Sequence, residues 1–104
     1  MATKESIEFD FQKALDQANR LDEIAAELKS LSADEFAGSM QNLAGGWKGE
    51  NATLYLNKGQ KLQDSMTSTA ADLSGAASNI RTIAKRTYEA EMAALKIAET
   101  RRYR

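Results

Sequence analysis

No proline interrupts this chain of 104 residues. Proline breaks helices because it lacks an amide hydrogen and its ring clashes with the preceding turn. Its absence, together with many strong helix formers such as Ala, Leu, Lys and Glu, favours long uninterrupted helices. A chain of this length holds one domain at most, so we expect a single all-α domain over residues 1–104.

The first segment with helical periodicity of its apolar residues spans about residues 10–44. Its apolar residues recur every three or four positions, as a helix with one buried face requires; they are Phe11, Ala14, Ala18, Leu21, Ala25 and Leu28. Residues 7–11 instead alternate apolar and polar, which predicts an extended segment leading into the helix. Ser32 and Glu35 fit a capping box, which marks either a new helix start or a position inside a continuous helix.

A second segment with helical periodicity spans about residues 52–101. The predicted seam consists of Tyr55, Leu62, Met66, Leu73, Ala76, Ile80, Ile83, Ala90, Ala94 and Ile97. Residues 45–51 form the turn, where Gly45, Gly46 and Gly49 supply backbone freedom and Asn51 is the expected N-cap. Because the turn is short, the sequence predicts an antiparallel helix-turn-helix hairpin.

Charge is divided unevenly along the chain. Residues 1–50 carry ten acids and five bases, whereas residues 51–104 carry five acids and nine bases. An antiparallel hairpin places the acidic beginning of the first helix beside the basic end of the second. Each exposed pair contributes only about 0.2–1 kcal/mol, so this pattern favours a direction of pairing more than it stabilises the fold.

The composition excludes most catalytic chemistry. The chain contains no Cys and no His, which removes thiolate metal sites and the commonest general base. The carboxylates fall on polar faces, and no phosphate-binding glycine motif is present. We therefore expect no enzyme, no cofactor and no metal site.

The apolar stripes are wider than one helix–helix contact needs. A two-helix hairpin would leave much of them in water, and exposed apolar patches mark interaction sites. The sequence therefore predicts that two hairpins pair into a dimeric four-helix bundle. The expected interface residues are Phe11, Leu21, Leu28, Leu73, Ile80 and Ile83, and the partner is either a second copy or a different helical protein.

The turn contains Trp47-Lys48-Gly49. A Trp-x-Gly motif in the central turn of a helical hairpin of about one hundred residues resembles the WXG (early-secreted-antigenic-target-like) family of type VII secretion. This resemblance implies that Trp47 and Gly49 shape the turn. It also implies that the chain is made in the cytoplasm of a Gram-positive bacterium and secreted without a cleaved signal peptide.

The C-terminal tail departs from the actinobacterial members of that family. Their signal is Tyr-x-x-x-Asp/Glu, but the residue four positions after Tyr88 is Met92. The candidates for an export signal are Tyr88, Glu89, Glu91 and Tyr103. The tail looks more like members from Firmicutes, which implies a small substrate, or a targeting partner of the helical domain of a larger LXG-type toxin, that meets the type VII export ATPase.

Two other functions were weighed against secretion. Amphipathic helices also suit a membrane-active secreted effector, but the acidic first helix would be repelled by anionic lipid, so stable membrane insertion is not expected. The basic tail suits nucleic acid, but the neighbouring acidic helix should neutralise its field, so no nucleic-acid partner is expected.

Overall fold

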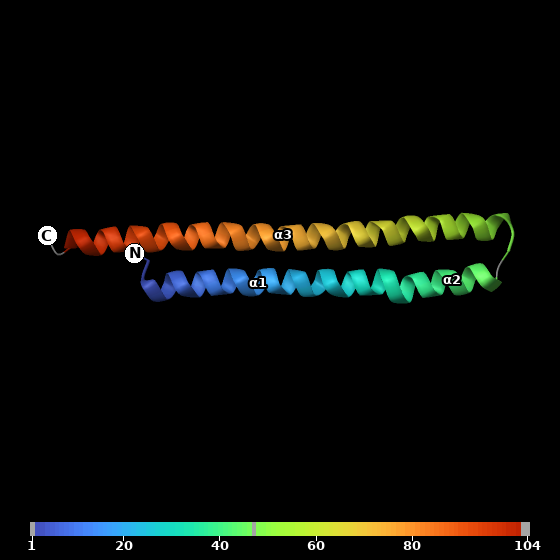
Figure 1. The fold of residues 1–104 in the computed structure, drawn as a ribbon, viewed down its shortest axis with the longest axis horizontal. Helices are drawn as coiled ribbons and strands as arrows, with labels where there is room; N and C mark the ends of the chain where they lie inside the picture. Colours follow the sequence, from blue (N-terminus) through green and yellow to red (C-terminus); the bar gives the residue numbers. More distant parts are fainter. Residues whose placement is uncertain (1, 47, 103–104) are drawn as a thin grey trace. The chain divides into compact units, whose positions relative to one another are not determined.

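The computed structural model describes residues 2–46 and 48–102, with the side chain of residue 102 left out. Its elements are α1 (Lys4–Ser30), a π-helical segment η1 (Leu31–Phe36), α2 (Ala37–Gly46) and α3 (Glu50–Arg102) (Figure 1). The described residues are all-α, as the sequence predicts. They form two compact units: unit 1 comprises Met1–Leu21 with Gly75–Arg104, and unit 2 comprises Asp22–Ser74.

In unit 1 the beginning of α1 packs antiparallel to the end of α3 (Figure 1). The rings of Phe11 and Tyr88 stack with their centroids 4.6 Å apart. Further along α1, Arg81 Nη2 donates a hydrogen bond of 2.9 Å to Asn19 Oδ1. The numbers rise on one helix as they fall on the other, so the predicted antiparallel packing is confirmed here.

The start of α1 differs from the predicted extended segment, because the helix begins at Lys4. Thr3 and Ser6 cap it reciprocally: Thr3 Oγ1 accepts from the Ser6 amide, and Ser6 Oγ accepts from the Thr3 amide. These bonds satisfy amides that a helix leaves unpaired at its N-terminus. The alternation of residues 7–11 was therefore misleading, and Ile7 is buried at 2% exposure within the helix.

In unit 2 the chain turns between α2 and α3. Gly49 has a φ of 119°, a backbone conformation open mainly to glycine. Its carbonyl accepts hydrogen bonds from the amide and the hydroxyl of Thr53. Since α3 begins at Glu50, Asn51 lies inside the first helical turn and is not the N-cap. Trp47 lies outside the described residues.

Ser32 lies inside a continuous helical path, which is the second of the two possibilities above, and no new helix starts at it. The helix continues through it as the π-helical segment, and the Ser32 hydroxyl caps no helix end. Ser32 is 2% exposed, and its Oγ donates to the Gln63 carbonyl at 3.3 Å and lies 3.2 Å from Thr67 Oγ1. π-Helical turns are rare and hold one extra residue per turn. This polar contact fixes how η1 sits on α3 within unit 2.

Apart from Ile7, the buried hydrophobic residues of the described chain are all alanines. Unit 1 buries Ala18, Ala77 and Ala84, and unit 2 buries Ala25, Ala52 and Ala70. Part of the predicted seam of the second helix is exposed instead: Tyr55 63%, Leu62 53%, Ile83 62% and Ile97 55%. Small side chains let two helices approach closely, which turns the neighbouring stripe of large residues outward.

The polar contact at Ser32 predicts a measurable loss of stability. Ser32→Ala removes a part-buried hydrogen bond and should lower the free energy of unfolding by about 1 kcal/mol. Ser68→Ala, an exposed serine on α3, is the matched control and should have almost no effect. Urea denaturation followed by circular dichroism measures both. Equal values for the two variants would show that Ser32 contributes no specific contact.

The alanine contact in unit 1 predicts that a larger side chain lowers stability at residue 77 but not at residue 76. Ala77 is fully buried, whereas Ala76 is exposed. Ala77→Leu should destabilise by about 1–3 kcal/mol because extra methylenes force the helices apart. Ala76→Leu should change stability by less than about 0.5 kcal/mol. Thermal and urea unfolding of both variants distinguishes this arrangement from the predicted seam, which would reverse the order.

Candidate functional site

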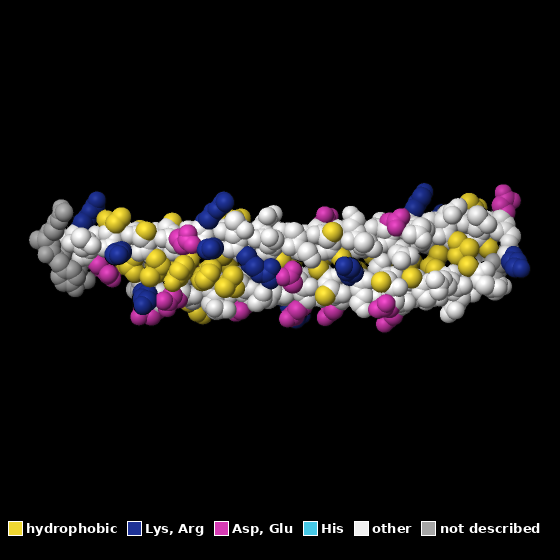
Figure 2. Space-filling view, viewed as in Figure 1, with side chains coloured by type: hydrophobic (Ala, Val, Ile, Leu, Met, Phe, Trp, Pro, Cys, Tyr) yellow, Lys and Arg dark blue, Asp and Glu magenta, His cyan; other side chains and the backbone are white. Residues whose placement is uncertain are grey.

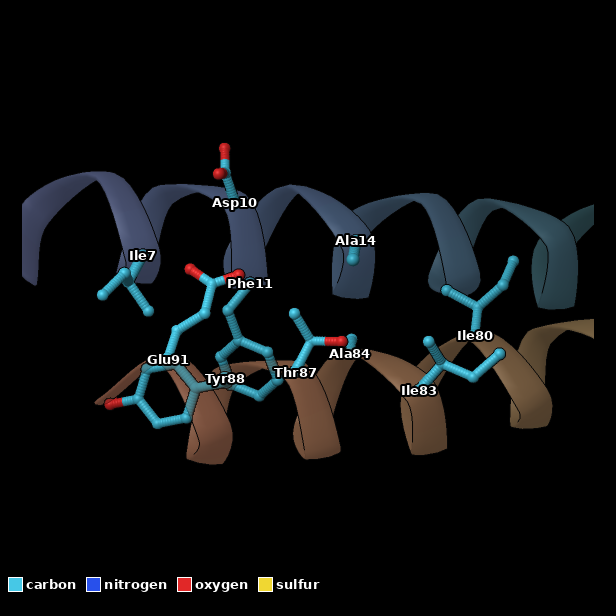
Figure 3. Close-up of a pocket in the computed structure, with 10 residues that line it drawn as sticks. All are labelled: Ile7, Asp10, Phe11, Ala14, Ile80, Ile83, Ala84, Thr87, Tyr88 and Glu91. Atoms are coloured by element: carbon cyan, nitrogen blue, oxygen red, sulfur yellow. The ribbon is translucent and has the colours of Figure 1, made fainter. Parts of the chain in front are cut away.

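Unit 1 contains a groove between the beginning of α1 and the end of α3. Figure 3 shows the side chains that line it, and its volume is about 280 Å³. From α1 come Ile7, Asp10, Phe11 and Ala14, and from α3 come Ile80, Ile83, Ala84, Thr87, Tyr88 and Glu91. Figure 2 shows apolar side chains gathered where these two stretches meet. The groove is open to solvent and mainly apolar.

The Phe11–Tyr88 pair forms an aromatic wall of the groove. The planes of the two rings are inclined by 25°, so the pair is stacked. Both side chains are half-buried, and the pair joins α1 to α3. Such pairs contribute about 0.5–1.5 kcal/mol beyond the area that they bury. Tyr88 is therefore a packing residue of unit 1 in addition to any role in export.

Ile83 gives the groove its exposed apolar edge. Ala84 is buried at 8% exposure in the contact between the helices, and Ile80 is half-buried. Ile83 follows on the same side of α3 with 62% of its surface exposed. A large aliphatic side chain in this position can be covered only by another molecule or another segment of protein.

Two carboxylates belong to this mainly apolar lining. The Glu91 side chain extends from α3 toward Ile7 and Phe11, whereas the Asp10 side chain points away from α3 at the α1 edge of the groove (Figure 3). Elsewhere in the described residues, no group of three His, Cys, Asp or Glu side chains could hold a metal ion. The groove can thus bind an apolar surface that also presents polar or cationic groups.

The structure brings together only part of the predicted interface. Phe11, Ile80 and Ile83 line the groove of unit 1. Leu21 belongs to the same unit and is half-buried outside the lining. Leu28 and Leu73 are half-buried residues of unit 2.

The four candidates for an export signal do not all line the groove. Tyr88 and Glu91 line the groove, whereas Glu89 is exposed and does not. Tyr103 lies outside the described residues. No common surface of the four residues is therefore described, and their role as a signal stays a prediction.

Several lining residues escaped the sequence analysis. Asp10 and Thr87 are polar residues with no motif around them. Ile7 was placed in an extended segment, although Ile7, Ala14, Leu21 and Leu28 recur at intervals of seven. That heptad spacing was the signal that could have identified Ile7 as part of the helical face.

The described residues thus define an all-α protein whose antiparallel helices leave an open, mainly apolar groove. None of the helices in the described ranges is apolar over a stretch long enough to cross a membrane. The chain matches the model of the PPE family over residues 12–101. It therefore belongs to the PPE family.

This family is a family of type VII secretion proteins. Its members are non-enzymatic substrates of the mycobacterial ESX systems, and they pair with PE proteins for export. The expectations of a type VII protein and of a non-enzyme are confirmed at this level. No curated protein and no solved structure matches the chain.

The predicted membership in the WXG family is wrong. It depended on a Trp-x-Gly tripeptide in the turn of a helical hairpin of about one hundred residues, whereas the PPE match covers residues 12–101. The Firmicutes origin is corrected with it, because the PPE family is mycobacterial. The match gives no support to an LXG-type toxin as partner or to a homodimer. The chain has no proline, so the match does not depend on the Pro-Pro-Glu tripeptide that names the family.

The aromatic stack predicts coupling between the two helices of unit 1. Phe11→Ala and Tyr88→Ala should each destabilise the protein, and the double variant should lose less than the sum of both. The difference should be about 1 kcal/mol, as expected for a stacked pair. Tyr88→Phe keeps the ring and should retain most of the stability. Additive losses in urea denaturation would contradict a direct Phe11–Tyr88 interaction.

Proposed function

We propose that this chain forms a heterodimer with a PE-type helical protein and is exported with it by a type VII system. Unit 1 binds the partner through its groove, with Ile83 inserted among the apolar side chains of a partner helix. The pair is then presented to the export ATPase as a substrate. The role is that of a substrate carried with its partner, since that is what PPE proteins are.

The exposure of Ile83 beside an open apolar groove carries this proposal. Unit 1 also exposes Ile97 at 55% on the same helix, and its helices are already in contact through alanines. Within unit 2, Leu31 and Leu62 are 43% and 53% exposed. Each unit therefore offers apolar surface that its own helices leave in water, as a protein with a helical partner does.

The free energy available from this surface is substantial. Fully burying one large aliphatic side chain contributes about 1.5–3 kcal/mol. Because 62% of Ile83 is exposed, a partner helix that covers it gains about 1–2 kcal/mol from that residue, which is roughly five- to thirtyfold in affinity. The proposed pairing needs no catalytic group and no bound cofactor.

Ile83→Asp should abolish the pairing without unfolding the chain. The residue is exposed, so the free protein tolerates the change, but a buried aspartate would oppose the complex. Ser78→Asp, an exposed position on α3 outside the groove lining, is the matched control. Each variant is co-expressed with PE proteins of the same genome, and complexes are weighed by light scattering after size exclusion. Equal pairing of both variants would contradict the proposed interface.

Export is tested with the same two variants in a mycobacterial host. The parent chain and Ser78→Asp should reach the culture filtrate, and Ile83→Asp should remain in the cells at a normal level with an unchanged helical spectrum. Deletion of the export ATPase should retain all three. Secretion of the parent chain without that ATPase would contradict the type VII route.

A further inference from the structure

Glu91 occupies a position that the rest of unit 1 gives to alanine. Counting in steps of seven along α3, residues 77, 84, 91 and 98 are Ala, Ala, Glu and Ala. Ala77 and Ala84 are buried against α1, at 0% and 8% exposure. Glu91 is half-buried in the same series and is its one charged member. A carboxylate thus stands where close helix packing favours a methyl group.

The Glu91 side chain lines two hollows of unit 1, which also share Ile7. One is the groove of about 280 Å³ that also contains Asp10, Phe11 and Ile83. The other measures about 210 Å³ and is otherwise lined by small and aliphatic residues, namely Ala2, Ile7, Ala94, Leu95 and Ala98. A helix that covers either hollow therefore lies against Glu91.

Among the described residues, no Lys or Arg lines either hollow. Lys13 and Arg86 are exposed and belong to neither lining. None of the interactions described for the chain involves Glu91, and the groove that its side chain lines is open to solvent. Covering the groove removes water from its carboxylate. Burying an unpaired carboxylate is costly, whereas a paired and hydrogen-bonded one is tolerated.

We propose that Glu91, with Asp10 at the groove edge, selects partner helices that place a Lys or Arg over the groove. This inference rests on the proposed pairing and adds the charge of the partner to it. A helix with the same apolar residues but an acid at that position is rejected, because two carboxylates would meet in an interface that excludes water. A purely apolar helix binds less well, because it leaves Glu91 unpaired.

The same charges oppose a second copy of this chain as the occupant. A symmetric dimer uses the same patch on both subunits. Groove against groove would bring the two Glu91 carboxylates together, with no Lys or Arg among the residues that line either groove. A basic partner helix is therefore the occupant that complements this surface.

Two synthetic amphipathic helical peptides provide the test. They share one apolar heptad pattern and differ only in carrying Lys or Glu at the flanking positions. Fluorescence anisotropy with the full 104-residue chain should give about tenfold tighter binding of the Lys peptide at low salt. Glu91→Gln should largely remove this preference, and Glu91→Lys should reverse it. Glu89→Lys makes the same charge change at an exposed position outside the lining and should leave the preference in place.

The outcomes separate this inference from the pairing itself. Equal binding of the two peptides, or no binding of the Lys peptide, overturns charge selection by Glu91. The same holds if Glu89→Lys shifts the preference as much as Glu91→Lys, because net charge alone would then explain it. The pairing is judged independently, by co-purification of a PE protein with the parent chain and with Ile83→Asp. Circular dichroism of Glu91→Gln and Glu91→Lys verifies that both variants fold.

Discussion

Most of the fully buried residues between the helices are alanines, and the exposure of the larger side chains follows from that choice. A methyl group lets the helical backbones approach closely but buries little apolar area. Ala77 and Ala84 therefore hold α3 against α1 in unit 1 without using the larger side chains next to them. Ile83 is left in solvent as a direct consequence. The free energy that its burial would contribute remains available for association with another protein.

The sequence predicted where the helices lie along the chain better than it predicted which side of each helix is buried. The missing proline and the three-four rhythm were sufficient for an all-α fold with antiparallel helices. The face of α3 was misassigned because hydrophobic patterns give more weight to Tyr55, Leu62 and Ile83 than to alanine. Both stripes have the same heptad period, so periodicity alone cannot separate the one that packs inward. Side-chain size decides this, through how closely the helices can approach.

Local signals failed where tertiary contacts overrode them. Ser32 and Glu35 match a capping box, but Ser32 is hydrogen-bonded to Gln63 and Thr67 of α3 instead. The alternating residues 7–11 suggested an extended segment, but the Thr3–Ser6 cap starts the helix earlier. Of the groove, Phe11, Ile80 and Ile83 could be predicted as interaction residues from their hydrophobicity. The importance of Asp10 and Glu91 depends on where packing places them, which no motif around them encodes.

A carboxylate inside an apolar groove also affects the chain before it meets a partner. Exposed apolar surface promotes non-specific association, and natural proteins limit this by placing charges within such surfaces. An apolar occupant without a cation would have to remove water from the Glu91 carboxylate, which is costly. The same residue therefore weakens wrong associations of the free chain and strengthens the right one. Alanine packing exposes the apolar groove, and one charged residue in the alanine series restricts what can cover it.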